Sequence, residues 1–198
     1  MNAIALVTAT TAEPVTRTEM KLWLRVDEHD VSEDPLIDSL ITRARLRFEE
    51  VNQRSCLVQT FDYYLDVPPD DLCPIELPKA PLVDVIAITG FSDMEGSDTG
   101  GTAMSTSGWY VDTAREFGRV VPLSAFTYPS ATRSINPTIV RFTAGYSTST
   151  TGVPESVKTE IKQLAAALYE HRGDELEQGT VLAGYGSVVT ELSLPTWG

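Results

Sequence analysis

The hydrophobic pattern of this chain changes from a helical period to a strand period and back again, and that change limits the folds open to it. Between residues 33 and 54, apolar side chains recur every three or four positions on one stripe, as in a helix with one buried face. Residues 57–146 instead form short alternating segments separated by turn residues, which is typical of strands. A helical stripe returns over residues 154–172. These periods predict an α+β fold, in which a bundle of about three helices carries a small antiparallel β unit inserted between the second and third helices.

The first predicted helix has a clear start signal. Thr16 and Glu19 have the spacing of a capping box, and Val15 and Met20 occupy the positions of a hydrophobic staple. A short helix is therefore predicted over residues 16–27.

The second predicted helix, over residues 33–54, has Ser32 as its expected N-cap. Glu33 and Asp34 place negative charge at the positive end of this helix, and Pro35 is tolerated in a first turn. The apolar stripe of this helix contains Leu36, Ile37, Leu40, Ile41, Ala44, Phe48 and Val51.

The chain is predicted to form one domain over residues 16–173, flanked by two extended arms. Residues 1–15 are interpreted as an N-terminal arm or a first strand. Residues 174–198 contain several glycines and no helical period, which predicts a C-terminal arm. With 198 residues, of which 42% are hydrophobic and 22% charged, the chain is long enough to bury a core and is not disordered as a whole.

The charge balance is strongly acidic, with 28 Asp and Glu against 15 Lys and Arg, a net charge of −13. Such a surface is repelled by phosphate backbones, so binding of nucleic acid by the whole surface is not expected. The acids concentrate in residues 60–99 and the arginines in residues 42–54. That asymmetry suits like subunits packing edge to edge, but a need for solubility explains net acidity equally well. Arg43 and Arg47 are candidates for contact with a neighbouring acidic subunit, and an intrahelical pairing or simple solvation explains them at least as well.

Residues that commonly perform catalysis are sparse. His29 lies in the connector between the first two helices, and His171 lies at the end of the third, where an imidazolium would favour the negative helix terminus. Cys56 and Cys73 form no CxxC pair or Cys/His cluster, so no zinc site is predicted, and free thiols and a disulfide both stay open. The sequence contains no GxSxG or HExxH motif. It predicts no enzyme, no cofactor and no metal.

One polar loop has the alternating oxygen-bearing side chains of a calcium site. Asp93, Glu95 and Ser97 are spaced by two, as in an EF-hand. However, Asp98 replaces the required glycine and Met104 replaces the acidic twelfth residue. An ordinary hairpin loop is the better interpretation.

The three tryptophans suggest different roles. Trp23 and Trp109 lie in a predicted helix and a predicted strand, where they are expected to be in the core. Trp197 lies on the C-terminal arm, and an exposed aromatic on an arm is typical of an anchor for a partner, although the arm folding back on its own domain is the alternative. The residues of this arm predicted to bind a partner are Val181, Leu182, Tyr185, Val188, Val189, Leu192, Leu194 and Trp197.

Several motifs follow one another in a distinctive order: LRVDEHDVSEDPLIDSLI, QTFDYYLD, IELPKAPLVDVIAI, then RFTAGYSTSTTGVP and a last helix ending in EHR. This order resembles that of the head–tail connector proteins of long-tailed bacteriophages, also called adaptor or head-completion proteins, which have relatives in prophages and gene transfer particles. The resemblance covers residues 17–173 and neither arm, and the order of the motifs carries it.

The resemblance implies a structural protein of a virion or phage-like particle. Such proteins are made in the bacterial host cytoplasm and form a ring at the head–tail junction, here expected to be a dodecamer, beneath the portal protein. The ring extends the DNA channel and offers a platform for a downstream stopper, neck or tail protein. DNA passes through without sequence-specific binding. By this resemblance the arm over residues 174–198 would bind the portal. No membrane partner is expected, because no apolar run approaches the roughly 18–20 residues of a membrane-spanning helix.

Three other functions stay open. The chain could be another neck protein, a stopper or a tail terminator, although these are usually mostly β with little N-terminal helix. It could be a small-ligand or carbohydrate-binding β module, given Tyr63, Tyr64 and Tyr110. An enzyme that uses an acid pair in the β unit is the third alternative.

Overall fold

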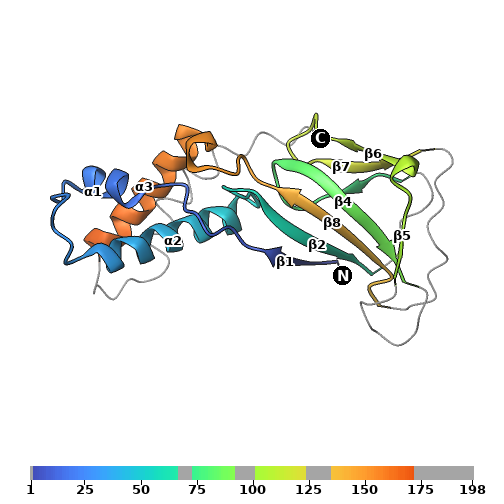
Figure 1. Ribbon diagram of the computed structural model, residues 1–198, viewed down its shortest axis with the longest axis horizontal. Coiled ribbons are helices and arrows are strands. Elements are labelled where there is room, and N and C mark those ends of the chain that lie inside the picture. The colour runs from blue at the N-terminus through green and yellow to red at the C-terminus, as the bar shows by residue number, and fades with distance from the viewer. Residues whose placement is uncertain (1, 67–72, 92–100, 124–134, 172–198) are drawn as a thin grey trace. The chain divides into compact units, whose positions relative to one another are not determined.

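The computed structural model of the protein describes residues 2–66, 73–91, 101–123 and 135–171. The chain forms two compact units (Figure 1). The β unit comprises residues 1–11 and 58–146, and the helical unit comprises residues 12–57 and 147–198. The inserted strands and the first residues of the chain thus form a unit of their own. Each unit is described by itself below.

Three α-helices form the described part of the helical unit. They are α1 (Arg17–Leu24), α2 (Asp34–Val51) and α3 (Glu155–Glu170), and a short 3-10 turn, η2 (Thr150–Gly152), precedes α3. Helix α2 packs against both α1 and α3. Each helix lies inside its predicted range, and the strands β2 to β8 follow α2 and precede α3 in the chain. The predicted α+β fold class is confirmed.

The predicted stripe of α2 is buried along most of its length. Its fully buried apolar members are Ile37, Leu40, Ile41, Ala44 and Phe48. Leu36 is half-buried, and Val51 at the last residue of the helix is exposed. Burying one Leu, Ile or Phe side chain contributes roughly 1.5–3 kcal/mol. Burial of this stripe, more than intrinsic helix propensity, therefore stabilises α2.

The start signal of α1 is confirmed and that of α2 is corrected. The Thr16 hydroxyl accepts a hydrogen bond from the Glu19 N–H at 3.2 Å, and the Glu19 carboxylate accepts one from the Thr16 N–H at 2.7 Å, which completes a capping box. The N-cap of α2 is Glu33 without a side-chain cap bond, so the prediction of Ser32 is wrong. The Ser32 hydroxyl instead donates to Asp30 Oδ1 at 2.6 Å, because a tight turn in the connector captures it first.

The β unit consists of two antiparallel sheets. The five-stranded sheet has the order β1-β2-β8-β4-β5, with β1 (Ala3–Thr8), β2 (Gln59–Leu65), β8 (Thr138–Ala144), β4 (Leu82–Gly90) and β5 (Thr102–Ala103). The three-stranded sheet has the order β3-β7-β6, with β3 (Ile75–Glu76), β7 (Arg119–Pro122) and β6 (Trp109–Asp112), and the turn η1 (Thr106–Gly108) leads into β6. The proline-rich segment that contains β3 lies at a sheet edge, as its prolines predict.

The core of the β unit is built from residues of both sheets. Phe61 and Phe142 stack at its centre, with ring centroids 5.6 Å apart. Ile75, Trp109 and Val120 of the three-stranded sheet belong to the same buried cluster. The prediction that Trp109 is a core residue is therefore confirmed.

On the opposite face of the five-stranded sheet, Asp62 and Arg141 lie directly across from each other on β2 and β8. Arg141 Nε and Nη2 each donate to a different Asp62 carboxylate oxygen at 2.7 Å. This forked pair explains why an aspartate in the middle of a strand is buried, since its charge is fully paired.

The first residues of the chain form a strand, which decides between the two interpretations of residues 1–15. Strand β1 pairs antiparallel with β2 and occupies one edge of the five-stranded sheet, as Figure 1 shows. All six of its residues are exposed. The N-terminal segment is thus part of the sheet, although it contributes no buried side chain to the core.

Candidate functional site

A group of charged side chains in the helical unit surrounds Arg45. Arg45 Nε lies 2.7 Å from Glu13 Oε2, and its Nη1 lies 3.0 Å from Glu49 Oε2. Glu49 Oε1 accepts a hydrogen bond from the Cys56 N–H at 2.9 Å. Arg45 and Glu49 are both buried. This network ties α2 to the segment before α1 and to the segment after α2, which is a structural use of charge.

A second group of charges holds the connector between α1 and α2. Lys21 is buried, and its Nζ lies 2.5 Å from Asp34 Oδ1. The same ammonium donates to the carbonyl oxygens of Glu28 at 3.2 Å and Asp30 at 2.7 Å. Arg17 Nη1 lies 2.8 Å from Asp34 Oδ2. The hydrogen bond from Lys21, together with the charge of Arg17 and against partial burial, lowers the pKa of Asp34.

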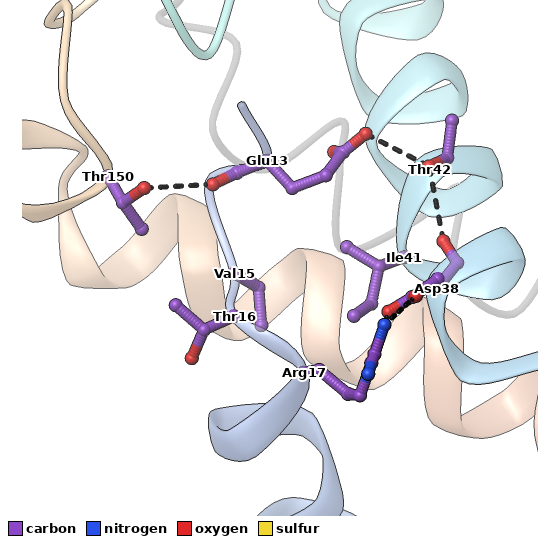
Figure 2. A pocket seen from close by; sticks show the side chains of 8 residues that line it. All are labelled: Glu13, Val15, Thr16, Arg17, Asp38, Ile41, Thr42 and Thr150. Atoms are coloured by element: carbon purple, nitrogen blue, oxygen red, sulfur yellow. Dashed lines mark hydrogen bonds and ion pairs between the residues drawn. The ribbon is translucent and has the colours of Figure 1, made fainter. Parts of the chain in front are cut away.

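A surface pocket of about 410 Å³ opens between these two groups in the helical unit (Figure 2). It contains two carboxylates, Glu13 and Asp38. Asp38 accepts a hydrogen bond from Arg17 Nε at 2.8 Å, and Glu13 is held by Arg45 and by the Thr42 hydroxyl at 2.9 Å. Figure 2 shows the Glu13 carboxylate directed at Thr42 and the Asp38 carboxylate directed at Arg17. Both are thus occupied as partners of arginines, and the pocket provides no carboxylate left over for acid–base chemistry.

The candidate catalytic residues of the sequence do not come together. His29 is exposed on the connector, and His171 is the C-cap residue of α3. Cys56 is buried and Cys73 exposed, and both are free, so the open alternative of a disulfide is excluded. Burial, and then the negative charge of Glu49, raise the pKa of the Cys56 thiol, which keeps it protonated and unreactive.

No group of three or more potential metal ligands occurs among the described residues. The calcium-like loop, Asp93 to Asp98, lies outside them. No helix in the described part of the chain is long and apolar enough to span a membrane.

The three tyrosines of the ligand-binding alternative do not form one platform. Tyr63 and Tyr64 are consecutive residues of β2, so their side chains point to opposite faces of the sheet. Tyr63 packs against the core, and Tyr110 lies on β6 of the other sheet. A flat aromatic surface for a sugar ring is not present among them.

Strand β1 presents an apolar edge. Leu6 is 52% exposed and Val7 45%, and the strand carries no charged residue or proline among Ala3–Thr8. Natural edge strands commonly carry charges or prolines that block pairing with another chain. Among the described strands, β1 pairs only with β2, so its other edge carries no strand partner there.

Arg43 and Arg47 lie on the exposed side of α2 together with Leu46. Arg47 Nη1 lies 3.0 Å from Glu50 Oε2, and Leu46 is 54% exposed. Arg43 forms no ion pair with any residue that the structure describes. The predicted interface residues are thus accessible, and an exposed leucine lies between them.

The predicted partner-binding residues of the C-terminal arm, Val181 to Trp197, lie outside the described residues. Trp23, predicted to be a core residue, is 45% exposed, and this prediction is wrong. Helix α1 has only eight residues, and Lys162 Nζ of α3 covers the Trp23 ring at 5.4 Å from its centroid.

Sequence reasoning missed two buried lysines as well as the buried Arg45. Lys21 and Lys158 are 3% and 4% exposed, and each belongs to a helix whose pattern treats lysine as a surface residue. The sequence feature that could have predicted their burial is their place next to an apolar stripe. Lys21 follows Met20 of the α1 face, and Lys158 follows Val157 of the α3 stripe. A lysine beside an apolar stripe can bury its stem and reach a carboxylate at the edge of the core.

Comparison with protein-family models finds no match, and comparison with curated proteins finds none. Solved structures do match. A chain from the neck of an empty GTA (gene transfer agent) particle, computed with C6 symmetry, is 22% identical with a TM-score of 0.77, and the match covers 99% of this chain and 98% of that one. A chain from the virion of a native gene transfer agent particle is 22% identical with a TM-score of 0.75, over 98% of this chain and 97% of that one.

A third structure, from the neck of a native GTA particle computed with C12 symmetry, is 24% identical with a TM-score of 0.69 and covers 94% of both chains. These likenesses extend over nearly the whole length of each chain and agree with the resemblance in the order of motifs. The protein has the fold of chains found in the neck and virion of gene transfer agent particles.

Proposed function

We propose that the protein is a structural component of the neck of a phage-like particle, and specifically the head–tail adaptor that docks beneath the portal. The observation that supports this most is the likeness to a chain from a GTA neck at a TM-score of 0.77 over 99% of this chain. A match over nearly the whole length includes both units and the order of their elements in the chain. A likeness limited to one small motif would not include them.

The same comparison supports a ring of identical copies. Two of the similar structures were computed with C6 and C12 symmetry. We propose a ring of this protein, with a dodecamer as the expected copy number. Closing a ring requires two different surfaces on each copy that fit each other.

The adaptor role is preferred to that of a stopper or tail terminator because of the helices. Helices α1 and α2 precede the inserted strands, and α3 follows them. Stoppers and tail terminators, in contrast, are usually mostly β with little N-terminal helix. The platform for the downstream neck or tail protein is then a further surface of the same ring.

The C-terminal arm over residues 174–198 is the proposed portal-binding segment. Its apolar residues, from Val181 to Trp197, would be ordered by the portal. Portal-bound arms would gather the subunits and raise their effective concentration, so that the ring closes on the portal.

The proposed role requires no catalysis and no cofactor. The net charge of −13 supports a channel through which DNA passes without sequence-specific binding, since attraction to DNA depends on many lysines and arginines. Both carboxylates of the described pocket are already paired with arginines.

Co-purification with the portal protein of the same genome tests this proposal. The full chain and a chain ending at residue 173 are each mixed with the portal and sized by light scattering. The full chain is expected to join the portal as a ring, and the shortened chain is expected not to. If the full chain ignores the portal, the adaptor role is contradicted. If both chains bind equally well, the role of the arm alone is contradicted.

A further inference from the structure

Helix α2 carries an exposed basic and apolar patch, which we call the α2 patch and define as Arg43, Leu46 and Arg47. These positions are three and four residues apart, so they lie on one face of the helix. Leu46 is 54% exposed, and the Arg47 side chain 44%. Arg43 forms no ion pair within the part of the chain that the structure describes. Arg47 Nη1 lies 3.0 Å from Glu50 Oε2, so Arg43 contributes most of the positive charge of the patch. An exposed leucine beside these arginines is a surface suited to an acidic partner with an apolar residue of its own.

The connector between α1 and α2 offers a surface of that kind. We call it the acidic connector and define it as Asp27, Glu28 and Val31. Asp27 and Glu28 are exposed, and Val31 is 69% exposed. Asp30 adds a further exposed carboxylate, and hydrogen bonds from Ser32 lower its pKa and so keep it ionised.

The acidic connector is held in shape before any partner arrives. Lys21 binds the carbonyl oxygens of Glu28 and Asp30, and so leaves the Glu28 carboxylate in solvent. Asp27 Oδ1 accepts the His29 N–H at 2.9 Å. Since the backbone is fixed from within, docking on this connector costs little ordering entropy.

The two surfaces of one copy are kept apart by the helix itself. Asp34 begins α2 next to the connector, and Arg43 lies nine residues further along, which corresponds to about 13 Å of helix. Arg43 is accordingly not paired with Asp27 or Glu28 of its own chain. Among the described residues, the two surfaces of one copy therefore do not neutralise each other.

We propose that the α2 patch of one copy docks on the acidic connector of the next copy in the ring. The occupant is a second copy because the chain supplies both complementary surfaces, basic and acidic, each with an exposed apolar residue. Such a contact joins different surfaces and so propagates from copy to copy, as a ring requires. This inference rests on the proposed function, because it names the lateral contact of the proposed ring.

Charge exchange between the two surfaces tests the contact. Full-length wild type, R43E/R47E and D27K/E28K are each mixed with the portal protein, and the copies bound per portal are counted by light scattering. Each variant alone is expected to lose lateral association by roughly tenfold or more, because like charges then face each other. An equimolar mixture of the two variants is expected to restore the ring. In an alternating ring, each reversed surface meets the complementary reversed surface of its neighbour.

Two controls keep the outcome clear. R115E makes one Arg-to-Glu charge reversal, of the kind that R43E/R47E makes twice, at an exposed arginine of the β unit and is expected to assemble as wild type. E28K alone, in which the lost carboxylate has only a 3.5 Å contact with His29 in the described structure, should weaken assembly without affecting folding.

If wild type forms a ring and the mixture does not restore it, or if R43E/R47E assembles normally, this contact is refuted while the proposed function stands. If wild type itself forms no ring on the portal, the proposed function is refuted as well.

Discussion

Lys21 shows how single residues of the helical unit use buried charge. Its side chain is almost completely buried, yet its ammonium has one carboxylate and two carbonyl partners. A buried ion pair is costly to desolvate, so its value lies in fixing geometry, and loss of one partner leaves the other uncompensated. Here the geometry that is fixed is the connector between α1 and α2. This role could not be predicted from the sequence, because the partners of Lys21 become neighbours only once the connector has turned back.

Replacement of Lys21 by methionine is expected to lower the free energy of unfolding by about 3 kcal/mol, because Asp34 and two carbonyl oxygens lose their buried cation. Urea denaturation followed by circular dichroism measures this change. K162M is the matched control, since Lys162 lies over the Trp23 ring and near Glu19 and takes no part in the connector network, and it should cost no more than about 1 kcal/mol. Equal losses in the two variants would contradict the role assigned to Lys21.

The carboxylate of Asp34 makes stability depend on pH in the acid range. Lys21 and Arg17 lower its pKa below the ordinary value of 3.8. A carboxylate with a lowered folded-state pKa contributes stability that is fully present above 3.8 and is lost as the pH falls through the folded-state value. Wild type is therefore expected to lose stability below a pH of about 4 more steeply than D34N. Urea midpoints across this range provide the test, and identical slopes would exclude the contribution of Asp34.

At the scale of elements, the sequence predicted those features of the helices that depend on contacts between residues close together in the chain. The capping box of α1 involves residues three apart, so Thr16 and Glu19 could be identified from spacing alone. The stripe of α2 was predicted for the same reason. The prediction that Ser32 caps α2 was wrong because Asp30, two residues earlier, accepts the hydrogen bond of the Ser32 hydroxyl. The prediction that Trp23 is buried was wrong because α1 has only eight residues, and which of its faces is buried depends on how α3 packs beside it.

The order of the strands could not be predicted, because their pairing is long-range. Strand β8 lies between β2 and β4, and the pairing of β2 with β8 joins residues about eighty positions apart, such as Asp62 and Arg141. No local rule chooses that partner. The forked pair between these two side chains then favours this register, since a slip of one strand by one residue would place the two side chains on opposite faces of the sheet.

Substitution T16A is expected to destabilise the protein by about 1 kcal/mol, because the N–H of Glu19 loses its acceptor and the capping box is broken. T18A, at an exposed position two residues into the same helix, is the matched control and should change stability by less than about 0.5 kcal/mol. Thermal unfolding of the two variants measures the difference. A T16A variant as stable as T18A would show that the cap contributes nothing.

At the scale of the whole molecule, the order of helices and strands was the most informative feature of the sequence. The periods predicted an α+β fold with about three helices, and the order of motifs pointed to the neck of a phage-like particle, which agrees with the fold found in GTA necks. The separation into two units was not predicted, since it depends on the chain's first strand joining the distant β2. The partner-binding arm stays a prediction, because residues 174–198 lie outside the described residues.

The measurement that tests the central claim most directly is an electron cryomicroscopy reconstruction of the particle encoded by the same genome, focused on the portal vertex. The account predicts one ring of this protein directly beneath the portal, with the helices and both sheets recognisable in each copy. A neck ring built by another protein, with this chain elsewhere in the particle or missing from it, would contradict the account.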